Sequence, residues 1–268
     1  YGVDLVEWQL RVARAEALPM AQDEISARRK GWAIEVRLCT EDPARNFMPQ
    51  TGSLLAWRPP VGNDMRVDHG LREGGVISPF YDSMQAKLIA YGASREQARR
   101  KLLQMLDEVV LLGINSNRDF LRQIIVHPVF ADGDFSTGFI GENFPADALF
   151  TSRQPGAHHS ALAAALIYHS EATQLSADAC LPDELQNWQS SAPAAVAVHL
   201  KVGDASHKLT VKALSAAHYH VQVGEVEVDI EFITVKAPDV QFIQNGIMKH
   251  ACFAFANDAI WISYEGLS

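Results

Sequence analysis

Short stretches of alternating apolar and polar residues after Pro193 constrain the fold most. A period of two is that of a β-strand with one buried face. Turn residues separate the stretches, at Gly203-Asp204, Gly224 and Asn257-Asp258. The alternating apolar positions are Val196, Val198, Leu200, Leu209, Val211, Val221, Val223, Val226, Val228, Ile230, Phe253, Phe255, Ile260 and Ile262. Short strands at this spacing predict an antiparallel meander that closes into a barrel.

A strongly helical segment precedes these strands. Residues 161–167 read Ala-Leu-Ala-Ala-Ala-Leu-Ile, and alanine and leucine have high helix propensity. We expect this helix to lie inside or across the barrel. The character of the chain changes near Pro145, so a domain boundary is predicted between residues 146 and 152.

Residues 31–51 carry the most informative pattern of the first half. The alternation predicts a strand with Glu35 and Arg37 on one face and Ile34, Val36 and Leu38 on the other. An acidic-proline turn follows at residues 40–43. An arginine and a carboxylate held on the open face of a half-buried strand suit a site that handles an anion.

The rest of the first half predicts further strands and packed helices. Strands are expected at residues 54–58, 65–69, 76–78 and 87–91, and a helix capped by Asp4 near the start. Ser94 and Gln97 form a capping-box pattern for a helix that Gly113 ends. Asn117 is expected to cap a second helix, which stops before Pro128. An antiparallel sheet with packed helices, followed by a helix wrapped by an antiparallel β-barrel, makes the fold class α+β.

Composition narrows the class of protein. The chain has 268 residues, 48% of them hydrophobic, and a formal charge of −9. The negative charge disfavours a nucleic acid or an anionic membrane as partner, and no apolar run is long enough to span a bilayer. Three scattered cysteines indicate reduced thiols and a cytoplasmic location. Because the first residue is Tyr1, we expect an excised piece of a longer protein.

Several separated motifs resemble one family in the same order. The start at residues 2–7, the stretch 31–51 and the segment 78–88 (SPFYDSMQAKL) resemble the C-terminal part of a biotin carboxylase, and residues 109–120 and 130–140 extend the match. Residues 149–268 are similar to the linking domain of acyl-CoA carboxylase alpha subunits. The resemblance therefore divides the chain into a biotin carboxylase C-terminal domain, residues 1–148, and a linking domain, residues 149–268.

The resemblance implies an ATP-dependent ligase. In this family ATP activates bicarbonate, and the ureido group of biotin is carboxylated after it becomes anionic. Arg37 stands where the family carries an arginine that stabilises this anion, so it is the expected catalytic residue. Glu35, Tyr81 and Asp82 are expected near the active site, where Tyr81 and Asp82 could orient Arg37 or a neighbouring helix. The alternative for Arg37 is a structural ion pair with Glu35 or Glu41.

Two further positions are implied by the resemblance. Arg66 matches a dimer-interface arginine of the family, although Asn63-Asp64 stands where an aromatic residue is expected. Thr137, Phe139 and Ile140 resemble the segment on the adenine side of the nucleotide site. The alternative for Phe139 and Ile140 is an ordinary core role.

The family also implies cofactors and partners. The full-length protein would use ATP with Mg²⁺ and biotin on a separate carrier domain, and none is expected bound to this fragment. The expected partners are a carboxyltransferase beta subunit, the biotin carrier domain and a homodimer through the first domain. The ATP-binding motifs cannot be placed here, so we expect the fragment alone to be inactive. A methylcrotonyl-, propionyl- or geranyl-CoA enzyme, a pyruvate carboxylase or single-subunit biotin carboxylase, and a non-catalytic protein-binding scaffold all stay open.

Two other patterns are interpreted as structural. Lys249 follows Met248, as in a biotin attachment sequence, but His250 follows it and few residues remain. Attachment at Lys249 is therefore not expected. Histidines at 158, 159, 169, 218 and 220 have no cysteine or carboxylate at a known metal-ligand spacing, so no metal site is predicted.

Overall fold

A computed structural model describes residues 1–144, 153–182, 185–202 and 205–267. The predicted domain boundary at 146–152 and the Gly203-Asp204 turn lie outside these residues. Within them, no helix is both long enough and apolar enough to cross a bilayer.

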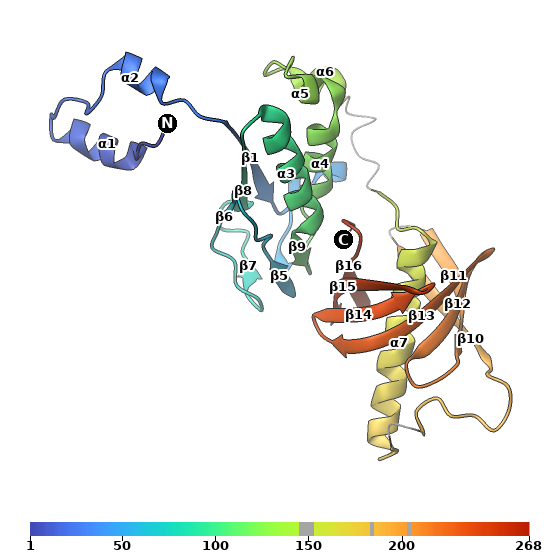
Figure 1. Cartoon of the computed structure of the whole chain (residues 1–268). Helices are drawn as coiled ribbons and strands as arrows, with labels where there is room; N and C mark the ends of the chain where they lie inside the picture. Colours follow the sequence, from blue (N-terminus) through green and yellow to red (C-terminus); the bar gives the residue numbers. More distant parts are fainter. Residues whose placement is uncertain (145–152, 183–184, 203–204, 268) are drawn as a thin grey trace.

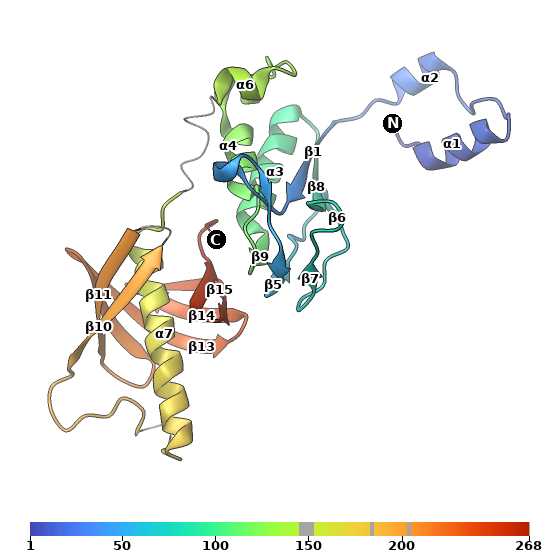
Figure 2. The same ribbon diagram turned by 180° about the vertical axis from the view of Figure 1, so that it is seen from behind.

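The first half is built on a three-stranded antiparallel sheet. Its order is β1 (Trp32–Cys39), β8 (Met84–Gly92) and β6 (Met65–His69). One face packs against α3 (Arg95–Glu108) and α4 (Arg118–Val126), as Figures 1 and 2 show. The alternation predicted for β1 is confirmed, since Leu38 is buried while Glu35 and Arg37 are exposed.

Smaller elements complete this half. Three two-stranded sheets pair β2 (Glu41–Asp42) with β3 (Met48–Pro49), β4 (Gly52–Ser53) with β7 (Val76–Ile77), and β5 (Ala56–Arg58) with β9 (Val110–Leu112). The short helices are η1 (Pro43–Arg45), α5 (Pro128–Asp132) and α6 (Phe139–Asn143). At the start, α1 (Leu5–Ala13) and α2 (Gln22–Ala27) form an arm away from both sheets (Figure 1). Asp4 caps α1 as predicted.

Two sequence predictions in this half are wrong. The helix expected to end at Gly113 stops at Glu108, where Val109 turns to extended backbone and the apolar strand β9 begins. Asn117 precedes α4 but its side chain makes no capping hydrogen bond. Its amide instead reaches back to β1, which is a contact between residues far apart in the sequence.

The second half is a long helix held in a curled sheet. The helix α7 (Ala157–Asp178) packs into seven antiparallel strands in sequential order, as Figure 2 shows. The strands are β10 (Ala195–Val202), β11 (Ala205–Ala213), β12 (His218–Val223), β13 (Val226–Lys236), β14 (Asp239–Gln244), β15 (Ile247–Ala256) and β16 (Ala259–Ser263). Residues 160–166 are all buried, so the strands surround the helix over this stretch.

The predicted barrel is open. Among the described strands, β10 and β16 are the two ends of the sheet and do not pair with each other. The meander is therefore a half-barrel. Its core joins the buried alanines and leucines of α7 to inward-facing strand residues such as Val221, Ile230 and Phe242.

A small seam joins the two halves. Ala56, Val110 and Leu112 of the first half form an apolar cluster with Cys252 of β15, and Trp261 packs against it. At a second point, Nη2 of Arg118 donates a hydrogen bond to the carbonyl oxygen of Gly266 at 3.2 Å.

The half-barrel should lose stability in mild acid. Burial lowers the pKa of His159 and of His169, both on α7, below the usual value of 6.5. The unfolded chain then binds more protons than the folded chain as pH falls below about 6.5, so the unfolding free energy decreases in that range. Hydrogen exchange of α7 amides can be compared at about pH 7.5 and about pH 5, with each rate corrected for the intrinsic exchange rate at that pH. The free energy of opening should be smaller at the lower pH. An equal or larger free energy of opening at the lower pH would contradict this prediction.

Candidate active site on the three-stranded sheet

The solvent face of the three-stranded sheet carries two rows of side chains. The strand register places Arg37 opposite Lys87 and Lys87 opposite Asp68. In the neighbouring row, Ile89 lies between Glu35 and Arg66. Directly opposed residues point to the same face of a sheet. The expected catalytic arginine and the expected dimer arginine therefore share one charged face, two strands apart.

The ion pairs on this face involve other residues and leave the Arg37 guanidinium available to bind an anion. Nζ of Lys87 lies 3.5 Å from Oε1 of Glu35, and Arg66 forms an ion pair with Asp68 at 2.8 Å. Among the described residues, the Arg37 guanidinium has no hydrogen bond or ion pair of its own. The expected alternative, an ion pair with Glu35 or Glu41, is not formed, since Glu41 accepts from the Ser83 hydroxyl instead. An exposed guanidinium with all five donors free can bind an external anion.

Asn117 holds the backbone beneath Arg37. Its Oδ1 accepts a hydrogen bond from the Cys39 amide at 2.9 Å, and its Nδ2 donates to the Arg37 carbonyl oxygen at 3.2 Å. The Asn117 side chain is only 7% exposed. Because both contacts are with β1 backbone, they fix the end of the strand that carries Arg37. Sequence reasoning missed this role, because a local capping role fits the same asparagine.

Replacing Asn117 with alanine should therefore weaken the sheet. The change leaves a part-buried amide and a carbonyl without their partners, which costs about 1–3 kcal/mol of unfolding free energy. Urea unfolding measures the loss. Asn115, two residues earlier and exposed, is the matched control, and its replacement by alanine should change the unfolding free energy by less than about 0.5 kcal/mol. Equal stability of the two variants would contradict the role given to Asn117.

Tyr81 and Asp82 lie apart from the Arg37 side chain. Both line an open cavity of about 620 Å³ between Thr40, Gln50 and Ser78, and Arg37 is not part of its lining. Tyr81 is 93% exposed, and Asp82 accepts a hydrogen bond from the Met84 amide. The described contacts place neither side chain against Arg37, and the expected position of both residues near the active site stays a prediction.

The three residues expected near a nucleotide divide between core and surface. Phe139, 5% exposed, packs edge-to-face on His127 and Phe144. Thr137 is exposed and Ile140 is 44% exposed. A core role is therefore correct for Phe139 and wrong for Ile140, whose side chain is on the surface of α6.

The structure also defines the contacts of Lys249 and of Cys252. Lys249 lies within β15, and its ammonium group is 2.5 Å from Glu265.

In the part of the chain that the structure describes, one group of three side chains has the composition of a metal site: Asp239, His250 and Cys252. Burial and the neighbouring Asp239 raise the pKa of the Cys252 thiol to about 12. The spacing His250-x-Cys252 was the missed signal, because residues two apart on a strand share a face.

Comparison with known proteins identifies the first half. Residues 35–142 match the family model of the biotin carboxylase C-terminal domain. Among solved structures, the biotin carboxylase domain of a Hydrogenobacter thermophilus 2-oxoglutarate carboxylase has a TM-score of 0.51 and 33% identity, covering 57% of this chain and 33% of that one. The biotin carboxylase subunit of a pyruvate carboxylase has the same TM-score at 30% identity, with the same coverage.

Curated relatives extend the match. The methylcrotonoyl-CoA carboxylase alpha subunit of Dictyostelium discoideum is 39% identical over 173 residues, which is 64% of this chain and 24% of that protein. The corresponding subunit of Oryza sativa is 37% identical over 201 residues, 72% of this chain and 27% of that protein. Biotin carboxylase 1 of Bacillus subtilis is 38% identical over 139 residues, 52% of this chain and 30% of that protein. The chain thus spans 24–30% of the length of these three relatives. The chain is similar to methylcrotonoyl-CoA carboxylase alpha subunits, and its residues 35–142 match the biotin carboxylase C-terminal domain family.

Proposed function

We propose that this chain is the C-terminal part of an ATP-dependent biotin carboxylase subunit, in which Arg37 stabilises the negative charge that develops on the ureido oxygen of biotin. One observation carries the proposal: within the family-matched segment, Arg37 is an exposed guanidinium without a partner among the described residues. A fixed guanidinium suits this step because it keeps its proton at neutral pH and presents paired donors to an oxygen anion.

The neighbouring residues support a positioning role for the sheet. Asn117 fixes the β1 backbone beneath Arg37, and the Glu35–Lys87 ion pair beside it occupies the competing carboxylate. Of the residues expected near the nucleotide, Ile140 has side-chain surface available for an adenine ring, whereas Phe139 is buried in the core. ATP with Mg²⁺ and carrier-bound biotin supply the carboxyl-transfer chemistry of the full-length protein.

The proposal extends to the type of carboxylase and to two domains, residues 1–148 and 149–268. The matches with the Dictyostelium and Oryza alpha subunits, over 173 and 201 residues, are longer than the first domain and so must reach the second. The pyruvate carboxylases of Pichia angusta and Aspergillus niger match over 145 and 156 residues. The two longest of these matches support the methylcrotonoyl-CoA type over a pyruvate carboxylase or a single-subunit biotin carboxylase, whereas the alpha subunits of Mus musculus and Rattus norvegicus match over 143 residues, about as short a stretch as the pyruvate carboxylases do.

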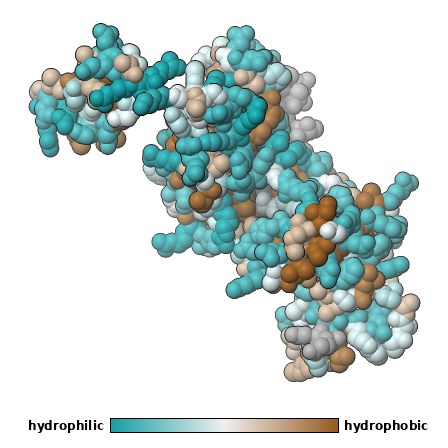
Figure 3. All heavy atoms as spheres, viewed as in Figure 1, coloured by the Kyte–Doolittle hydropathy of each residue, from teal (hydrophilic) through white to brown (hydrophobic). Residues whose placement is uncertain are grey.

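A surface of the half-barrel supports an assembly role. Figure 3 shows an apolar patch over the second half. Exposed large apolar side chains of this sheet include Val226, Ile233, Ile247, Met248 and Phe255. Such surfaces mark protein contacts. We propose that the second domain docks on a carboxyltransferase beta subunit; co-purification with the methylcrotonoyl-CoA beta subunit, lost when Ile233 and Met248 are changed to serine, tests this.

A chimaera tests the proposed activity. Residues 32–144 of this chain would replace the segment that they match in biotin carboxylase 1 of Bacillus subtilis. We expect the chimaera to hydrolyse ATP in a biotin- and bicarbonate-dependent manner, and we expect the unmodified 268-residue chain not to do so. A folded chimaera without activity would contradict the proposed function, and an active unmodified chain would contradict the expectation for the fragment.

A further inference from the structure

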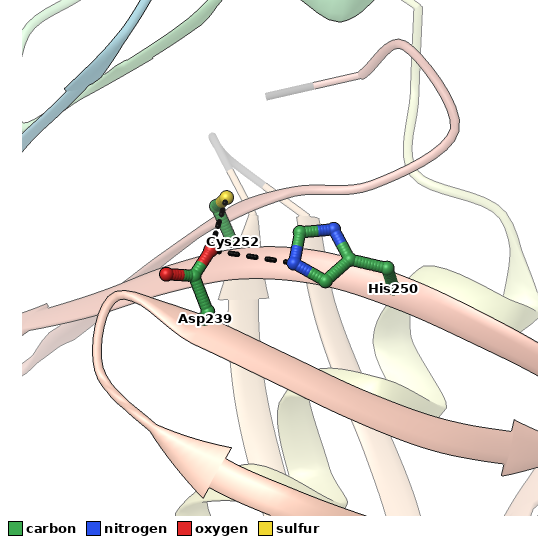
Figure 4. A group of neighbouring side chains, drawn as sticks. All are labelled: Asp239, His250 and Cys252. Carbon is green, nitrogen blue, oxygen red and sulfur yellow. Dashed lines mark hydrogen bonds and ion pairs between the residues drawn. The ribbon is translucent and has the colours of Figure 1, made fainter.

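Asp239, His250 and Cys252 come together on one face of a β-hairpin. The register pairs Asp239 of β14 with Cys252 of β15, and Gln241 with His250. His250 and Cys252 are two residues apart on one strand, so both point to the face that also carries Asp239. Figure 4 shows the imidazole ring and the sulfur atom on either side of the Asp239 carboxylate.

Two of the three distances between these atoms are close to those around a tetrahedral zinc ion. Oδ1 of Asp239 is 3.3 Å from Nε2 of His250 and 3.4 Å from Sγ of Cys252. Ordinary zinc bond lengths at tetrahedral angles separate a carboxylate oxygen from an imidazole nitrogen by about 3.4 Å, and from a sulfur by about 3.6 Å. All three atoms lie within 4.8 Å of one another.

The surroundings also suit a metal site. Cys252 is 5% exposed and packs against Ala56, Val110 and Leu112 of the first half, which shields the sulfur on one side. The side chains of His250 and Asp239 are 54% and 49% exposed, which leaves an entry path from solvent. Nη2 of Arg58 lies 3.9 Å from Oδ2 of Asp239, the oxygen that the other two ligands do not contact. A partner on that oxygen holds the carboxylate in place.

We propose that Asp239, His250 and Cys252 form a zinc-binding site at the seam between the two halves. A thiolate, an imidazole and a carboxylate are zinc ligands, and three protein ligands leave the fourth tetrahedral position to water. The site is independent of the proposed carboxylase function, because none of its ligands lies on the Arg37 face. Bound zinc would fix the β14–β15 hairpin where it contacts the first half.

The test uses the full chain, reduced and freed of metal, with Zn²⁺ and Co²⁺ as probes. Equilibrium dialysis should give one zinc per chain, and the cobalt form should show tetrahedral ligand-field bands with a thiolate charge-transfer band. His250→Gln should lower the zinc affinity at least about tenfold. Because His250 is exposed, this variant keeps the fold. Cys252→Ser should remove the thiolate band.

Matched controls are available elsewhere in the chain. Cys180→Ser and His199→Gln change exposed residues of the same types and should leave zinc binding unchanged. Zinc should also protect Cys252, but not Cys180, from alkylation. The proposal is overturned if no zinc binds, if His250→Gln and Cys252→Ser bind it as the parent does, or if the cobalt spectrum is octahedral without a thiolate band.

Discussion

Replacing Arg37 with alanine in the biotin carboxylase chimaera is expected to lower kcat for biotin-dependent ATP hydrolysis about one hundred- to one thousand-fold. This is the effect of removing one preorganised donor from an oxygen on which negative charge develops. Because the interaction strengthens as the charge forms, kcat should fall more than KM rises. Steady-state rates at saturating bicarbonate, with free biotin varied, measure both constants.

Two variants show whether the guanidinium itself is required. Arg37→Lys keeps the charge but loses the planar pair of donors, so it should recover only part of the rate. Arg100→Ala removes an exposed arginine of α3 that pairs with Glu96, and it should leave the rate unchanged. If Arg37→Ala retains the parent rate while the chimaera stays folded, Arg37 is a structural residue and the proposed role is wrong.

The largest loss of stability is expected from Leu166→Ala. Leu166 is 1% exposed and is the last residue of the buried α7 stretch that the half-barrel surrounds. Removing its side chain leaves a cavity between helix and sheet, which costs about 2–5 kcal/mol of unfolding free energy. Urea unfolding of the full chain and hydrogen exchange of the α7 amides measure the loss.

The same helix provides the control. Leu175 is 68% exposed, so Leu175→Ala makes the same chemical change without a cavity and should alter the unfolding free energy by less than about 0.5 kcal/mol. A Leu166→Ala variant as stable as Leu175→Ala would mean that the helix does not fill the half-barrel in solution.

Local patterns predicted most of the elements. Period-two alternation located β1 and most strands of the half-barrel, because each has one buried face. The alanine-rich run at 161–167 predicted α7, and the Ser94 hydroxyl accepts from the Gln97 amide at the start of α3 as expected. The face that carries Arg37 also followed from alternation alone.

Contacts between distant residues were not predictable in this way. Val109 and the following apolar residues continue a helical pattern, and only pairing with β5 makes β9 a strand. The Asn117 amide finds its partners in β1, which no neighbouring residue indicates. Closure of a barrel depends on strand curvature, and alternation does not report curvature. The Asp239–His250–Cys252 group requires the register across the Asn245-Gly246 turn.

Asn117 and Arg118 are consecutive residues whose side chains contact different halves of the molecule. The Asn117 side chain donates a hydrogen bond to the backbone of β1, the strand that carries Arg37. The Arg118 side chain donates one to the carbonyl oxygen of Gly266, near the end of the half-barrel. The start of α4 thus links β1 to the half-barrel through hydrogen bonds from two consecutive side chains. A tilt of the half-barrel would therefore be transmitted to the β1 backbone through these two adjacent side chains, alongside the apolar cluster at the seam.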